Sequence, residues 1–257
     1  MKKEPALRDV LVNTVGLEVV ERPEAPSWRH DYPYQTLRTE DPKEAKARAM
    51  AKGPILIFIG PPGVGKTFFA RWFQGLARAE GFASSEVQIS EAETPLHRLE
   101  TVYRRLIEHL MTEGGERGAM RAIIDGWFYA LEEEVLAREG DCAEDRLLQA
   151  SEALMTERLR PIERQAPAFG ACLRIYRRAV AAGDEALASG LIAWMSGQPN
   201  VAAAVKRAAG IKGDIDHFGA LGFLQGLLLI LRDSGFSGLV LVLDEVETLQ
   251  RVRGDVR

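Results

Sequence analysis

The stretch Gly60-Pro61-Pro62-Gly63-Val64-Gly65-Lys66-Thr67 fits the pattern G-x-x-x-x-G-K-[ST], which is typical of loops that bind phosphate groups. Five apolar residues, Ile55–Ile59, precede it and predict a strand buried on both faces. Residues 68–78 follow without a proline and predict a helix. The order of strand, glycine loop and helix is the one that phosphate binding requires, so we favour it over a chance glycine turn.

The residue types in this loop suit a nucleotide. Its glycines can adopt positive φ and let backbone N–H groups approach phosphate oxygens, and the following helix N-terminus favours an anion. Lys66 would reach the β- and γ-phosphates, and the Thr67 hydroxyl would ligate Mg²⁺. The predicted nucleotide-binding residues are therefore Gly60, Pro61, Pro62, Gly63, Val64, Gly65, Lys66, Thr67 and the adjoining Phe68.

Composition limits the classes of function. The chain has 257 residues, 46% of them hydrophobic, and a formal net charge of −4. This charge argues against bulk electrostatic attraction to nucleic acid, although a local contact with DNA stays open. The longest apolar runs are core-sized, the N-terminus has no signal sequence, and the two cysteines have no metal-ligand spacing. We therefore predict a cytoplasmic protein that is not inserted in a membrane.

A long helical region follows the loop. Gly81 ends the first helix, and residues 86–90 predict a short strand. Apolar residues then recur at helical spacing almost continuously from residue 94 to residue 234. The predicted helices span roughly residues 94–110, 120–135, 143–160, 167–182, 183–194, 199–210 and 215–234. In the fourth of these helices, Phe169, Leu173, Tyr176 and Val180 should face inward.

A second motif, an apolar strand that ends in two acidic residues, follows the helical region. Leu239–Leu243 are five apolar residues that predict another core strand, and Asp244 and Glu245 follow it directly. Alone, this pair would be a solvated strand end. Together with the phosphate loop, Asp244 is predicted to hold Mg²⁺ and Glu245 to act as general base on the attacking water, with Lys66 as the second catalytic residue.

The spacing of the two motifs predicts the domain organisation. We expect an N-terminal arm at 1–53, the first part of a P-loop ATPase core at 54–93, a helical insertion at 94–234 and a second part of the core at 235–257. The fold class is α/β, with an AAA-like parallel sheet. Since the chain ends soon after Glu245, we expect a piece of a longer protein that binds ATP weakly and does not hydrolyse it by itself.

Three segments resemble the ATP-binding proteins of BREX phage-defence systems, the BrxC/BrxD-type family. They are residues 94–99, residues 124–127 and the run 235–247, and the resemblance covers roughly residues 54–257. It implies an AAA-like ATPase, with Walker A and Walker B motifs, that uses ATP and Mg²⁺. It also implies action with other defence proteins on DNA and a homo-oligomer when the protein is full length.

Two rival functions and several other residues complete the predictions. One rival is a nucleotide-gated switch or scaffold with little turnover, and the other is a small-molecule kinase, for which no arginine-rich lid is visible. Asp125 is expected to be a surface residue beside a core Trp127, and Arg177 and Arg178 are expected on a solvated helix face.

Overall fold

A computed structural model describes residues 63, 65–164 and 166–246. The chain divides into two compact units, Met1–Glu80 and Gly81–Arg257. The predicted arm and the predicted strand Ile55–Ile59 lie outside the described residues.

In the first unit, the described part is essentially one helix. Helix α3 (Lys66–Ala79) begins directly after Gly65, and the buried side chains on it are Phe73, Gln74 and Ala77. This confirms the helix predicted after the glycine loop.

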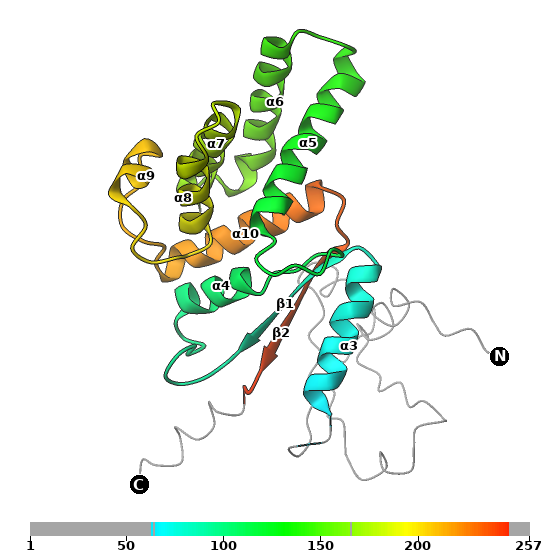
Figure 1. Ribbon diagram of the computed structural model, residues 1–257, viewed down its shortest axis with the longest axis vertical. Helices are drawn as coiled ribbons and strands as arrows, with labels where there is room; N and C mark the ends of the chain where they lie inside the picture. Colours follow the sequence, from blue (N-terminus) through cyan, green and yellow to red (C-terminus); the bar gives the residue numbers. More distant parts are fainter. Residues whose placement is uncertain (1–62, 64, 165, 247–257) are drawn as a thin grey trace, which may run out of the picture. The chain divides into compact units, whose positions relative to one another are not determined.

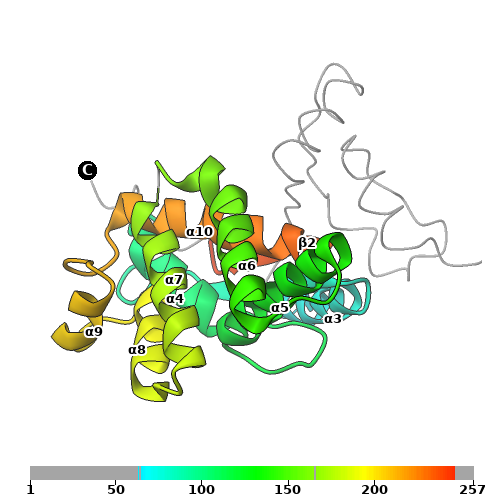
Figure 2. The same cartoon turned by 90° about the horizontal axis from the view of Figure 1, so that it is seen from above.

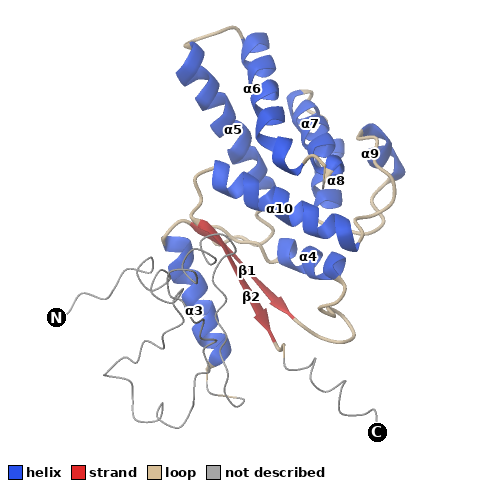
Figure 3. Cartoon of the chain, turned by 180° about the vertical axis from the view of Figure 1, so that it is seen from behind, coloured by secondary structure: helices blue, strands red, loops and turns tan. Residues whose placement is uncertain are grey.

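The second unit contains a small parallel sheet. Strand β1 (Phe82–Gln88) pairs with β2 (Gly238–Asp244), from Phe82 opposite Gly238 to Gln88 opposite Asp244. Figure 3 shows both arrows pointing the same way, with α4 and α10 on one side of them. The strand predicted at 86–90 starts earlier than expected, because the hydrogen-bonded ladder with β2 decides its ends.

The α-helices between the strands were predicted, with shifted ends, whereas the 3₁₀ turn η2 was not. In chain order the elements are α4 (Leu99–Glu108), α5 (Met120–Glu139), α6 (Glu144–Leu159), the 3₁₀ turn η2 (Arg160–Ile162), α7 (Pro167–Ala181), α8 (Glu185–Met195), α9 (Ala203–Ala208) and α10 (His217–Asp233). Helices α5 and α6 form one pair and α7 and α8 another, while α10 runs beneath them toward β2 (Figure 1). Figure 2 shows the short helix α9 at the outer end, next to α8.

Local signals explain where several helices begin. The side chain of Asp184 accepts a hydrogen bond from the Leu187 N–H at 3.0 Å, and Asp216 accepts one from the Gly219 N–H at 2.7 Å. Such caps satisfy N–H groups that have no partner inside the helix. Pro167 stands at the first position of α7, where its missing N–H costs nothing.

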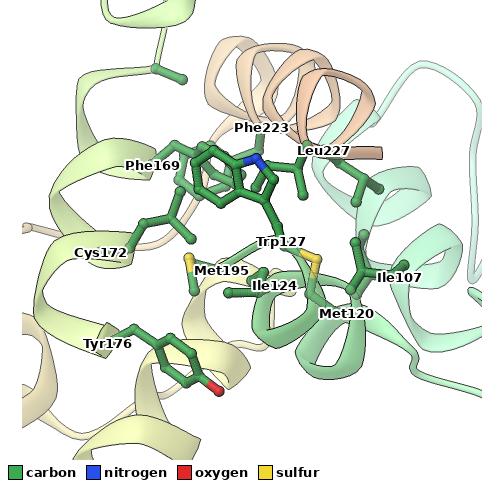
Figure 4. Close-up of a cluster of buried hydrophobic side chains, with 14 of the residues drawn as sticks. Ile107, Met120, Ile124, Trp127, Phe169, Cys172, Tyr176, Met195, Phe223 and Leu227 are labelled. Carbon is green, nitrogen blue, oxygen red and sulfur yellow. The ribbon is translucent and has the colours of Figure 1, made fainter. Parts of the chain in front are cut away.

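One hydrophobic core joins the helices to the sheet. Trp127 of α5 and Phe169 of α7 are fully buried, and the Phe169 and Phe223 rings meet edge to face with centroids 5.1 Å apart. Figure 4 shows side chains from α4, α5, α7, α8 and α10 converging there. Ala83 and Val87 of β1 belong to the same cluster. The predicted helical insertion and the two strands therefore share a core.

Two predicted side-chain positions are wrong. Val180 is 48% exposed, because Ala179 takes the inward position at the end of α7. The Arg177 side chain is only 11% exposed: it donates to Glu132 Oε1 at 2.7 Å and its guanidinium lies over the Phe128 ring. Packing of α7 against its neighbours, rather than the local sequence, decides both positions.

Candidate functional site

The phosphate-loop residues that the structure describes have the backbone that glycine permits. Gly63 and Gly65 adopt φ values of 83° and 88°. A Cβ added at either position would meet nothing within 4 Å. Glycine is therefore favoured at these positions because the backbone is left-handed, and not because a Cβ would clash with a neighbour. The predicted Gly60, Pro61, Pro62 and Val64 lie outside the described residues.

The N-terminus of α3 suits an anion. Lys66 and Thr67 are its first two residues, and the Gly65 carbonyl accepts the first helical hydrogen bond from the Phe69 N–H at 2.9 Å. The N-cap residue Gly65 has no side chain with which to cap this end, and the first turn holds no acidic residue. Both features keep the positive end of the helix dipole suited to a negative ligand. Phe68 follows in the same turn and is 78% exposed.

The acidic pair lies at the carboxyl end of β2. Asp244 is the last residue of the strand, and its carbonyl accepts a hydrogen bond from the Ile89 N–H at 2.9 Å. Its side-chain Oδ1 accepts a hydrogen bond from the Glu245 N–H at 3.0 Å. The hydrogen bond from Ile89 holds Asp244 at the end of the sheet, where α/β proteins place their ligands.

Glu245 has a strained backbone. Its φ is 60°, and the other non-glycine residue with positive φ among the described residues is Asn200. Asparagine tolerates this conformation, whereas for glutamate it costs about 1–2 kcal/mol. A strained backbone persists only where the surrounding structure maintains it, and such residues are often found at functional sites. The strand pattern in the sequence gave no indication of this turn.

The two groups of predicted site residues belong to different units. Gly63 and Gly65–Phe68 are in the unit Met1–Glu80, and Asp244 and Glu245 are in the unit Gly81–Arg257. In the described part of the chain, no three His, Cys, Asp or Glu residues gather as a metal cluster. The predicted ligands, the Thr67 hydroxyl and the Asp244 carboxylate, are hard oxygen donors of the type that Mg²⁺ prefers when phosphates complete its coordination.

Sequence reasoning missed one residue beside the acidic pair. Gln88 is the register partner of Asp244 and is exposed. Its position could be found only from the pairing of β1 with β2, because the two residues are far apart in the chain.

Asp125 has a structural role. Its Oδ1 accepts a hydrogen bond from the Tyr176 hydroxyl at 2.6 Å. Burial, followed by this hydrogen bond, raises the pKa of Tyr176. Asp125 itself remains exposed while Trp127 is fully buried, which confirms the prediction for both residues.

Comparison with known families gives one match. The family described as BREX system ATP-binding protein BrxC/D matches residues 43–257. Searches of curated proteins and of solved structures found no match. No helix in the described ranges is long and apolar enough to cross a membrane. The family match includes the glycine loop, the helical region and the acidic strand, and it confirms the resemblance seen in the sequence. The chain belongs to the BREX system ATP-binding protein BrxC/D family.

Proposed function

We propose that this chain binds ATP with Mg²⁺ and hydrolyses it as part of a BREX-type or related anti-phage defence system. The observation that carries the proposal is the acidic pair Asp244 and Glu245 at the carboxyl end of β2, with Glu245 held in a left-handed turn. The family to which the chain belongs is described as ATP-binding, so we infer that the nucleotide is ATP.

Each site residue has a role in this proposal. The backbone of residues 60–67 and the Lys66 ammonium hold the phosphates, since a glycine loop that opens a helix provides N–H groups and a positive dipole. Thr67 and Asp244 hold Mg²⁺ through oxygen atoms. The metal, when bound, would neutralise negative charge on the phosphate oxygens.

Glu245 would act on water. Its carboxylate accepts a proton from the attacking water and orients it for in-line displacement at the γ-phosphate. The strained backbone of Glu245 sets the direction in which its side chain leaves the main chain, which is a form of preorganisation. We propose that the released energy changes the conformation of a complex with DNA or with other defence proteins, in a cytoplasmic homo-oligomer.

The first test measures nucleotide affinity by isothermal titration calorimetry. Lys66→Ala should weaken ATP binding about 10-fold to 100-fold, because a hydrogen bond to a charged group contributes about 1.5–3 kcal/mol. Lys212→Ala is the matched control, since Lys212 is an exposed lysine in the loop before α10. Unchanged affinity in Lys66→Ala would show that the glycine loop is not the ATP site.

The second test separates an ATPase from a nucleotide-gated switch. Glu245→Gln keeps the size of the side chain and removes the base, so it should retain ATP binding and lose phosphate release. The family description names ATP binding and does not mention hydrolysis, so a nucleotide-gated switch is the second candidate function. A wild-type protein that binds ATP without releasing phosphate would establish the switch instead.

A further inference from the structure

A cluster of polar side chains joins α5, α6 and α10 at the edge of the hydrophobic core. The Trp127 indole N–H donates a hydrogen bond to Asp233 Oδ2 at 2.7 Å, and Arg158 Nη1 lies 2.9 Å from Asp233 Oδ1. Arg158 Nη2 also donates to both carboxylate oxygens of Glu134 at 2.8 Å. These four residues, Trp127, Glu134, Arg158 and Asp233, form what we call the polar clamp. Each of the three helices contributes at least one of its side chains.

Asp233 depends on these partners. It is the last residue of α10, where the helix dipole disfavours a negative charge. Its side chain is only 14% exposed, so the Arg158 cation and the Trp127 N–H replace hydration that the carboxylate has lost. Trp127 is fully buried, and its N–H would lose its acceptor if Asp233 moved away. Because breaking one contact leaves another buried polar group unpaired, we expect the polar clamp to open and close as a unit.

A short, hydrogen-bonded connection leads from the polar clamp to β2. Residues 234–237 join α10 to β2, and Figure 1 shows the chain passing from one to the other in a single turn. Gly235 has a φ of 82°, and the N–H groups of Gly235 and Phe236 donate to carbonyls in the last turn of α10, which is a Schellman motif. The Ser237 N–H donates to the Gly81 carbonyl at 3.0 Å, directly before β1. A displacement at the end of α10 is therefore transmitted to the start of β2.

We propose that the polar clamp couples the position of the α5–α6 pair to β2, and so to Asp244 and Glu245 at the end of that strand. The closed polar clamp holds the end of α10 against α5 and α6. Its opening releases the start of β2 and loosens the ladder with β1. Such coupling is reciprocal, so a ligand at Asp244 acts on the α5–α6 pair as strongly as that pair acts on Asp244. The use of this coupling in ATP hydrolysis rests on the function proposed above for Asp244 and Glu245.

Hydrogen exchange of the 257-residue chain without nucleotide, followed by mass spectrometry, tests the coupling. Arg158→Met keeps an apolar stem and removes the guanidinium that contacts Asp233. It should accelerate exchange in the segment 235–246 about 10-fold, the effect of losing a hydrogen bond between charged groups, and leave α7 and α8 unchanged. Arg178→Met is the matched control, because Arg178 also pairs with a glutamate of α6, Glu152, but its side chain is 66% exposed and lies on α7.

A second variant tests whether the polar clamp acts as a unit. Asp233→Asn keeps the shape of the side chain and removes its charge, so it should accelerate the same segment as Arg158→Met. The double variant should exchange no faster than the faster single variant, because the two residues are in contact. Effects that simply add would overturn the proposal.

Two results of the comparison without nucleotide would also overturn it. If Arg158→Met exchanges like Arg178→Met in the segment 235–246, the polar clamp does not act on β2. If Arg158→Met accelerates α7 and α8 as much as this segment, the variant has lost stability throughout the chain and no specific coupling exists.

A measurement with nucleotide separates this proposal from the proposed function. Mg²⁺ with the ATP analogue AMP-PNP should slow exchange in α5 and α6 of the wild type, and should do so less in Arg158→Met. Slower exchange in the segment 235–246 without any change in α5 and α6 would contradict the coupling. If the nucleotide changes exchange nowhere in the chain, the proposed function fails, and the comparison without nucleotide still decides the coupling.

Discussion

Gly226 of α10 offers a sharp test of the core packing. A Cβ built at this position would lie 2.6 Å from Cε1 and 2.7 Å from Cδ1 of Phe169. Carbon atoms pack at about 3.5 Å or more, so the ring would have to move by roughly 0.9 Å. Phe169 is fully buried and its ring meets Phe223 edge to face, so the core offers little room for that movement. Gly226→Ala should therefore overpack the core.

The magnitude follows from two opposing effects. Overpacking of a dense core costs about 1–3 kcal/mol, and a ring without free space should cost about 2–3 kcal/mol. Alanine in place of a helical glycine contributes about 0.5–1 kcal/mol in the other direction. We expect Gly226→Ala to lower the free energy of unfolding by about 1–2 kcal/mol, measured by urea denaturation followed by circular dichroism.

A matched control lies on α5. Gly126 is also a helical glycine, but it is exposed and an added Cβ meets nothing within 4 Å. Gly126→Ala should thus raise the free energy of unfolding by about 0.5–1 kcal/mol. The double variant Gly226→Ala, Phe169→Leu should recover part of the loss, because the two sites are in contact. If Gly226→Ala were as stabilising as Gly126→Ala, the close packing of α10 against α7 would be refuted.

Two further predictions concern titratable side chains. Burial raises the pKa of the Cys172 thiol to about 12, whereas Cys142 is partly exposed. A thiol reagent such as DTNB at pH 8 should therefore label Cys142 in the native chain and both cysteines in guanidinium chloride, and equal native rates would contradict the burial of Cys172. A hydrogen bond from the Arg121 guanidinium, with a second from a serine hydroxyl, lowers the pKa of Glu185 from 4.5 to about 2. Because the folded-state pKa is the lower one, the stability that Glu185 contributes is fully present above about pH 4.5 and is lost as the pH falls toward 2. The difference in unfolding free energy between the wild type and Glu185→Gln should shrink across this interval, and a constant difference would contradict the ion pair.

The sequence by itself determined the features that depend on local patterns. The glycine loop, the helix after it, the helical region and the acidic strand were all recognised from residues close together in the chain. Helical periodicity is set by the apolar face that each helix must bury, so it can be read without knowing the partner. The same motifs, with the segments at 94–99, 124–127 and 235–247, were enough to identify the family that matches residues 43–257.

The tertiary structure alone decided the features that depend on distant partners. The ends of β1 follow from its ladder with β2, and that ladder brings Gln88 beside Asp244. The burial of Arg177 depends on Glu132 and Phe128 of another helix. In each case the energy comes from a contact between residues far apart in the sequence, and a local pattern carries no record of such a contact.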